Sequence, residues 1–178
     1  QNIKGSSTDQ TITRVTVEEQ STGDFSIGVG YSSLDKTSLQ LGINERNFLG
    51  TGRRASASIT TSDKRTDFVL GLTQPYLFGR DLTGSADLFK AKSTANNTST
   101  NRTGIDLGAR FKAANDVYHR VGYGISTSKI TNTSTSATSV TGENGKSLLK
   151  SAASYTIGRD TRDNRFDPTE GFFTEISE

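Results

Sequence analysis

Apolar and polar residues alternate with a period of two along most of this chain. The alternation is clearest in residues 25–31 (FSIGVGY) and 39–43 (LQLGI). Successive side chains of a β-strand point to opposite faces, so this pattern predicts strands with one apolar face and one polar or small face. The two segments are expected to form a β-hairpin whose odd-numbered residues share the apolar face.

The same alternation recurs toward the end of the sequence and predicts a consecutive antiparallel meander. Further strands are expected at residues 55–59, 68–72, 82–88, 105–111, 121–125 and 149–157, and a ninth begins at residues 172–176. Residues 11–20 (TITRVTVEEQ) carry charge on both faces and are expected to belong to a preceding soluble domain.

Composition decides which environment this sheet occupies. Only 30% of the residues are hydrophobic, and 21 basic residues are balanced by 19 acidic ones. That apolar content is low for a soluble domain of this length, and no apolar run reaches the ~20 residues of a membrane-spanning helix. A membrane strand needs only ~9–11 residues with one apolar face. The pattern therefore favours an all-β, antiparallel, up-and-down transmembrane β-barrel, with a soluble antiparallel sandwich as the alternative.

The connections between the expected strands also alternate in length along the sequence. Residues 90–101 and 130–146 are rich in Ser, Thr and Asn and are expected to form long loops, whereas residues 47–52, 77–81 and 113–116 are shorter. Outer-membrane barrels have short turns on one rim and long extracellular loops on the other. Residues 93–101 and 131–145 are expected to be the mobile extracellular parts. The aromatic residues expected to form an interfacial girdle at the short-turn rim are Phe48, Tyr76, Phe78, Phe111 and Tyr118.

Residues that could carry catalytic or metal chemistry are sparse. The chain has no cysteine and one histidine, His119, which has no nucleophile pattern nearby and is interpreted as an interfacial side chain. Asp160, Asp163 and Asp167 resemble part of a calcium loop, but the interposed arginines predict a salt-bridged turn instead. We expect no enzyme active site, no metal site and no cofactor. Scattered Lys and Arg residues give no reason to expect nucleic-acid binding.

Four strings resemble a known family in their order and spacing. They are VEEQSTGDFSIGVGYSS (residues 17–33), ERNFLGTG (45–52), QPYLFGR (74–80) and RDTRDNRFDPTEG (159–171). Together they resemble the barrel start of the BamA-type outer-membrane insertases, in the bacterial surface-antigen superfamily, over nearly the whole chain. The resemblance implies a larger, sixteen-stranded barrel in the bacterial outer membrane. Residues 1–20 would be the tail of the last periplasmic POTRA domain and its linker. Residues 21–178 would be the N-terminal half of the barrel, with about eight complete strands and the start of a ninth.

The resemblance also implies how such a barrel acts. In that family the first strand pairs weakly with the last, and an incoming substrate strand pairs with the exposed edge. Here the substrate-binding residues would be the backbone groups of Phe25, Ser26, Ile27, Gly28, Val29, Gly30, Tyr31, Ser32 and Ser33. The partners would be the lipid bilayer, unfolded outer-membrane proteins and accessory lipoproteins. Gly28 and Gly30 would loosen this strand, although glycines on the lumen side of other strands could simply relieve crowding.

Three other functions remain open at the level of the sequence. A translocation-and-assembly-module barrel belongs to the same superfamily. A passive pore or secretion barrel would have the same strand pattern, and a soluble adhesin-like sheet would share the alternation. POTRA repeats upstream in the full-length gene would favour the insertase.

Overall fold

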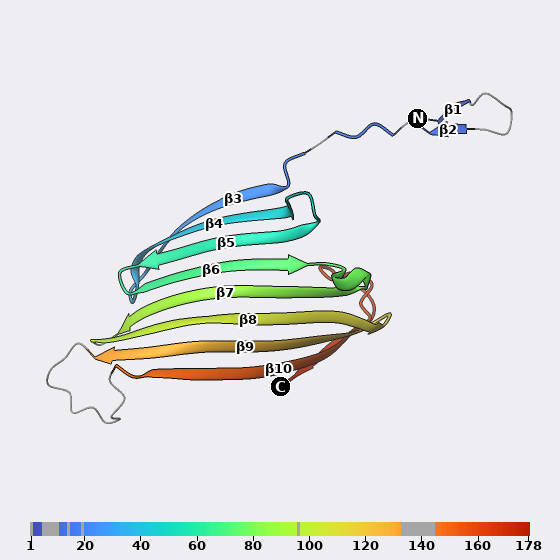
Figure 1. Ribbon diagram of the computed structural model, residues 1–178. Coiled ribbons are helices and arrows are strands. Elements are labelled where there is room, and N and C mark those ends of the chain that lie inside the picture. Colours follow the sequence, from blue (N-terminus) through green and yellow to red (C-terminus); the bar gives the residue numbers. More distant parts are fainter. Residues whose placement is uncertain (1, 5–10, 14, 19, 96, 133–144) are drawn as a thin grey trace.

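In the computed structural model, a single curved antiparallel sheet dominates the chain (Figure 1). The structure describes all residues except 1, 5–10, 14, 19, 96 and 133–144. Nine strands pair in sequence order, each with the next. They are β3 (Gly23–Ser32), β4 (Lys36–Phe48), β5 (Arg53–Ser62), β6 (Arg65–Gln74), β7 (Leu82–Ala95), β8 (Thr98–Ala114), β9 (Val117–Asn132), β10 (Ser147–Asp160) and β11 (Phe173–Ser177). The predicted consecutive meander is confirmed.

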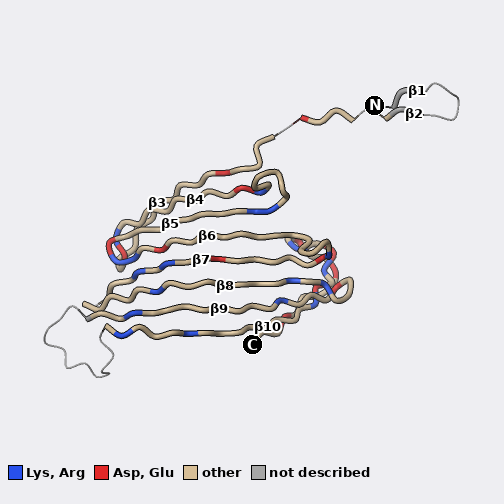
Figure 2. The backbone as a smooth tube through the Cα atoms, viewed as in Figure 1, with Lys and Arg blue, Asp and Glu red and all other residues tan. Residues whose placement is uncertain are grey.

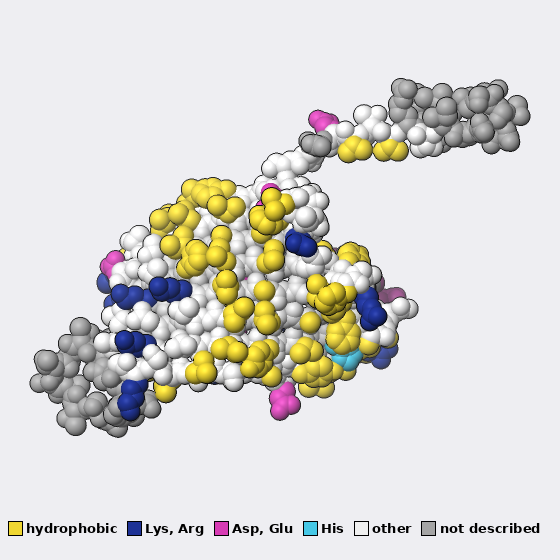
Figure 3. All heavy atoms as spheres, viewed as in Figure 1, with side chains coloured by type: hydrophobic (Ala, Val, Ile, Leu, Met, Phe, Trp, Pro, Cys, Tyr) yellow, Lys and Arg dark blue, Asp and Glu magenta, His cyan; other side chains and the backbone are white. Residues whose placement is uncertain are grey.

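Register places most of the apolar residues of the nine strands on one face. Because directly paired residues point to the same side, the pairs Phe25↔Ile43 and Leu70↔Leu88 fix that side at two points of the sheet. We call it the outer face, and Figure 3 shows its hydrophobic side chains crossing the sheet as a band. Among the described residues only one hydrophobic side chain, Tyr118, is buried. No second layer formed by the described residues packs against the apolar band, unlike in the core of a soluble sandwich.

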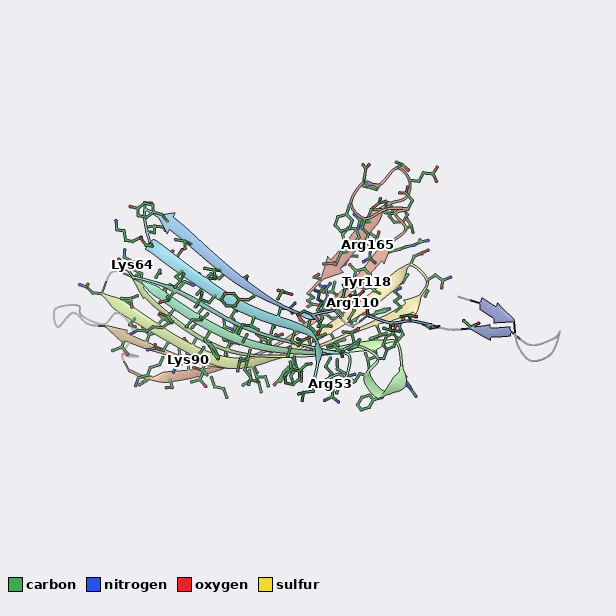
Figure 4. All side chains as sticks on the ribbon, turned by 90° about the horizontal axis from the view of Figure 1, so that it is seen from above. Arg53, Lys64, Lys90, Arg110, Tyr118 and Arg165 are labelled. Carbon is green, nitrogen blue, oxygen red and sulfur yellow. The ribbon has the colours of Figure 1, made fainter. Side chains whose placement is uncertain are left out.

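The opposite face carries small and polar residues and lies on the concave side of the sheet (Figure 4). We call it the lumen face. Ser26, Gly42 and Ser56 represent its composition on the first three strands. Charged residues are concentrated near the ends of the strands rather than in their middle (Figure 2). An apolar outer band, a polar lumen and charged rims are the arrangement of a membrane β-barrel wall, here an open sheet of nine strands.

The two rims differ from the expected division into short turns and long loops. β7 continues to Ala95 and β8 starts at Thr98, so the expected loop at residues 90–101 is a tight turn between paired strands. The prediction of a long loop there is wrong, because Ser and Thr side chains are compatible with strands and pair across this ladder. The connection between β9 and β10 lies mostly outside the described residues. On the other rim, residues 161–172 form a long connection between β10 and β11.

The expected aromatic girdle is partly correct. Phe111 lies on the outer face, where its ring stacks on His119 at 5.1 Å. Phe48 lines an outer-face depression with Ile43 and Leu72, because the ladder with β5 shifts register between Glu45 and Phe48. A bulge of this kind inserts an extra residue and re-aims the side chains that follow.

Tyr118 corrects the girdle prediction. It pairs with Lys112 and Gly158 on the lumen face, one residue out of phase with the outer-face His119. A shift of one residue in a strand moves a side chain to the opposite face. Tyr118 therefore does not face lipid, and only 7% of its surface is exposed.

The remaining described elements are small. β1 (Asn2–Lys4) and β2 (Thr11–Thr13) form a separate two-stranded sheet at the start of the chain. A 3-10 turn, η1 (Leu77–Gly79), connects β6 to β7. None of the helical segments in the described residues has the length and apolar character to cross a membrane.

Candidate functional site: the open edge of β3

β3 forms one edge of the main sheet, since its only strand partner among the described residues is β4. The two strands pair without a register shift from Gly23↔Glu45 to Ser32↔Lys36. The expected edge residues 25–32 therefore lie on one continuous strand. Ser33 lies outside β3, in the turn to β4, so the prediction that Ser33 belongs to the edge strand is wrong. A strand with one partner leaves a row of N–H and C=O groups unpaired on its other side.

The hydrogen-bonding pattern between β3 and β4 shows which residues of β3 carry the unpaired backbone groups. The N–H of Arg46 donates to the C=O of Thr22 at 3.1 Å, and these residues stand opposite each other in the β3–β4 register. In an antiparallel ladder, hydrogen-bonded and non-hydrogen-bonded pairs alternate. The even-numbered residues of β3 therefore direct their backbone groups toward β4. The residues that direct theirs to the open edge are Gly23, Phe25, Ile27, Val29 and Tyr31.

Apart from Gly23, these odd-numbered residues also carry the apolar side chains that β3 presents on the outer face. Phe25 is 62% exposed and Val29 75%, whereas Leu70, in the middle of the sheet, is 40% exposed. Interior residues are covered from two neighbouring strands and edge residues from one. The open edge thus combines free backbone hydrogen-bonding groups with uncovered apolar surface, and both would be covered by one further strand.

Two glycines, Gly28 and Gly30, lie on the lumen side of the edge. A β-carbon at Gly28 would meet only the side chain of Gln40, at ordinary contact distance, and one at Gly30 would meet Ser38 Oγ. Gly30 therefore resembles other lumen-face glycines that have a cross-strand side chain against them, such as Gly104 next to Phe89, whereas Gly28 has room for a β-carbon. Glycine contributes little packing within a strand. This strand is therefore fixed mainly by its backbone ladder.

Side-chain contacts hold β3 more firmly at one end than at the other. Near its start, the Thr22 hydroxyl donates to Glu45, and Asn44 Nδ2 donates to Asp24 Oδ2 at 2.9 Å. At the far end, the hydrogen bond from the Asp35 N–H to Ser32 Oγ, 2.8 Å long, lies within the hairpin turn. The first half of the strand is consequently tied to β4 by side chains and by backbone together.

Sequence reasoning missed a lumen-face cluster around Tyr118. The Tyr118 hydroxyl donates to the carboxylate of Glu175 on β11, and the Arg110 and Arg120 guanidinium carbons lie 4.7 and 5.9 Å from the ring centroid. Figure 4 shows Tyr118 and Arg110 on the concave side. The side chains of this cluster come from three strands, β8, β9 and β11. The even number of Tyr118, among odd-numbered outer residues of β9, is the signal that could have found it.

The predicted salt-bridged turn is confirmed. Arg162 Nε lies 2.8 Å from Asp160 Oδ1 and Arg162 Nη2 lies 3.1 Å from Asp160 Oδ2, while Arg165 Nε lies 3.5 Å from Asp160. The Asp163 carboxylate accepts hydrogen bonds from the Thr169 hydroxyl and the Thr169 and Glu170 N–H groups. These bonds lower the pKa of Asp163 to about 2. No group of side chains able to hold a metal ion was found among the described residues.

Comparison with known proteins places this sheet in a family. The sequence profile of the Omp85 superfamily domain matches residues 47–178, more than half of the chain. The chain belongs to the Omp85 superfamily. The outer membrane assembly factor BamA of Nitratidesulfovibrio vulgaris is 30% identical over 165 residues, which are 92% of this chain and 21% of that protein. The chain thus spans about a fifth of that relative's length.

A solved structure supports the fold of this Omp85 chain. The crystal structure of BamA from Haemophilus ducreyi lacking POTRA domains 1–3 superimposes with a TM-score of 0.65 and 20% sequence identity. The match covers 90% of this chain and 34% of the other. The predicted resemblance to BamA-type barrels is confirmed, and with it an outer-membrane location in a Gram-negative bacterium.

Proposed function

We propose that this Omp85 chain is part of an outer-membrane protein insertase and that the open edge of β3 receives substrate strands. A substrate strand would add to the sheet by backbone hydrogen bonds, the mode called β-augmentation. The observation that carries the proposal is the coincidence of free backbone groups and uncovered apolar side chains on the odd-numbered residues of β3. Strand pairing requires no catalytic residue and no cofactor.

The free-energy cost of unpaired backbone groups in a membrane supports a role for this edge in binding another strand. An unpaired N–H or C=O group in hydrocarbon costs several kcal/mol, so a permanently open edge within a membrane is not tolerated. In the full-length protein the edge must pair with another strand, from the same barrel or from a substrate. Gly28 and Gly30 contribute no side chains to contacts with such a partner strand, so one partner can be exchanged for another at lower cost.

The partners follow from the proposed function. Unfolded outer-membrane proteins would supply the incoming strands, and the bilayer would cover the outer face of the product. Accessory lipoproteins of an assembly complex are part of the same proposal. The turns 33–35, 63–64 and the one after Ala95 would lie on the extracellular rim, with residues 161–172 on the periplasmic rim.

Site-directed crosslinking tests this function. The chain has no cysteine, so single cysteines at Ser26 on the edge strand and at Ser126 on β9 can be introduced into the full-length protein. A substrate stalled during assembly, carrying a cysteine in its terminal strand, should crosslink to position 26. It should do so in steps of two substrate residues, since alternate residues share a face.

Interior positions provide the control. Ser126 and Ser56 also lie on the lumen face, but each is on a strand with neighbours on both sides. Equal crosslinking from position 26 and from these interior positions would contradict a privileged edge and favour a passive pore, which binds polypeptide anywhere along its lumen.

A further inference from the structure

Three lysines form a basic patch on the outer face, near the rim that carries the turn at residues 63–64. Lys90 and Lys92 lie on β7 and Lys129 lies on β9, and all three are exposed. We call these three residues the lysine patch. Their place on the outer face follows from register, because Lys90 pairs with Phe68 and Lys92 with Thr66. Figure 4 shows Lys90 on the convex side of the sheet, near the ends of the strands.

The patch adjoins the edge of the apolar band. Lys90 is the next outer-face residue after Leu88, and Lys92 follows it. At about 3.4 Å per residue, Lys90 lies about 7 Å beyond Leu88 along the strand. Beyond Leu88 the outer face of β7 therefore changes from apolar to basic, the change expected between the acyl chains and the headgroups of a membrane. Lysine side chains near such a boundary extend their ammonium groups into the headgroup layer.

Two of the lysines flank an amide across the sheet. Lys92 pairs with Asn101 on β8, and Asn101 pairs with Lys129. Neighbouring strands are about 4.8 Å apart, so the two lysine backbones are separated by about 10 Å with the Asn101 amide between them. Long flexible side chains can bring both ammonium groups to one anion from this spacing, and the amide supplies a further donor.

Carboxylates do not neutralise the patch. None of its lysines forms an ion pair with a residue that the structure describes. Asp63 shares a polar hollow with Lys92, but Lys64 and Arg65 line the same hollow. The outer face near the opposite rim has mixed charge, with Glu45 and Arg53 both placed there by register. Positive charge is therefore concentrated on the lysine-bearing side.

We propose that the lysine patch binds the phosphate groups of membrane lipids, with Lys92, Asn101 and Lys129 around one phosphate and Lys90 beside it. Charge complementarity and the position next to the apolar band identify the ligand: an anion that is attached to acyl chains. The proposal does not depend on substrate insertion at β3, and it adds a lipid contact on the wall of the barrel.

The test uses the full-length protein in nanodiscs of phosphatidylcholine containing a minority of phosphatidic acid. Native mass spectrometry measures how strongly phosphatidic acid is enriched among the retained lipids. Replacing all three lysines by glutamine (Lys90→Gln, Lys92→Gln and Lys129→Gln) should reduce that enrichment about tenfold, because each cation near a membrane surface attracts anionic lipid. The effect should weaken as salt is raised.

A matched triple variant keeps the change of net charge but leaves the patch intact. Lys36, Lys112 and Lys150 lie on the lumen face by register. Their replacement by glutamine should leave the enrichment unchanged. An equal loss in both variants would show attraction by net charge alone and would overturn the proposal. Displacement of phosphatidic acid by inorganic phosphate at equal concentration would likewise overturn it, because the site would then recognise a free anion.

Discussion

The ring of Tyr118 on β9 lies directly against Gly158 on β10, where it fills the position that a side chain would occupy. The Tyr118 hydroxyl also donates to Glu175 on β11. The Tyr118 ring thus leaves no room for a side chain at position 158. Together the two contacts connect β9, β10 and β11 on the lumen face.

Replacing Gly158 by alanine should destabilise the barrel by about 1–3 kcal/mol, the usual cost of overpacking. The new β-carbon would overlap the Tyr118 ring, which is buried on the lumen face. Loss of heat-modifiable mobility in gels, followed against temperature for the full-length protein, measures the effect. Gly28→Ala is the matched control, since a β-carbon there meets only Gln40 at ordinary contact distance. A Gly158 variant as stable as the Gly28 variant would contradict the packing described.

The turn at residues 161–172 should loosen in acid. The pKa of Asp163 is lowered to about 2 by hydrogen bonds from Thr169 and Glu170. A carboxyl group whose folded-state pKa is depressed stabilises the fold above its ordinary pKa, near 4, and loses that contribution as the pH falls toward about 2. Amide hydrogen exchange at Thr169 and Glu170 should therefore be protected at pH 5 and lose protection between about pH 4 and pH 2, after correction for intrinsic exchange rates.

An Asp163→Asn variant separates this effect from general acid unfolding. It lacks the titrating group, so its protection at these two amides should already be reduced at pH 5 and should change less across the acid range. Protection in the variant equal to that of the parent protein at pH 5 would show that the carboxylate does not hold the turn.

Much of the fold follows from the period of the sequence. The strands around residues 25–31 and 121–125 are correctly predicted because one face meets hydrocarbon and the other does not, which makes their alternation regular. The prediction of a long loop at residues 90–101 is wrong because segments rich in Ser, Thr and Asn can also pair with each other as strands. The structure pairs Ser93 with Thr100 and leaves a tight turn in which Asn97 has a positive φ of 62°.

The candidate site was only partly accessible to sequence reasoning. The strand was located through family resemblance, but a sequence does not show which backbone groups of a strand face an open edge. The direction of each backbone group depends on which residue pairs of β3 and β4 are hydrogen-bonded, and the hydrogen bond between Arg46 and Thr22 identifies them. Phe48 shows the same limit, since the bulge that turns it onto the outer face has no signature in the alternation.

The lysine patch has a further consequence for stability. Because Lys90, Lys92 and Lys129 repel one another without carboxylate partners among the described residues, anionic lipid should stabilise the barrel more than zwitterionic lipid does. The apparent melting temperature of the full-length protein should be higher in nanodiscs that contain phosphatidic acid. The triple glutamine variant should lose this difference, and a difference of equal size in that variant would contradict lipid binding at the patch.

A proline placed on β3 tests most directly whether its open edge receives substrate through its backbone. Val29 directs its N–H to the open edge, so Val29→Pro removes one edge donor and leaves the ladder to β4 intact; proline is tolerated on an edge strand in that orientation. Gly30 directs its N–H to β4. Gly30→Pro should instead weaken the hairpin and lower the stability of the barrel.

The measurement is the rate at which the full-length protein, reconstituted in proteoliposomes, folds a β-barrel substrate. Val29→Ala controls for the lost side chain. The account predicts that Val29→Pro folds correctly, as judged by heat-modifiable mobility, but assembles substrate about tenfold more slowly than Val29→Ala, the size expected for losing one buried hydrogen bond. Equal assembly rates for Val29→Pro and Val29→Ala, with both barrels folded, would contradict substrate pairing at this edge.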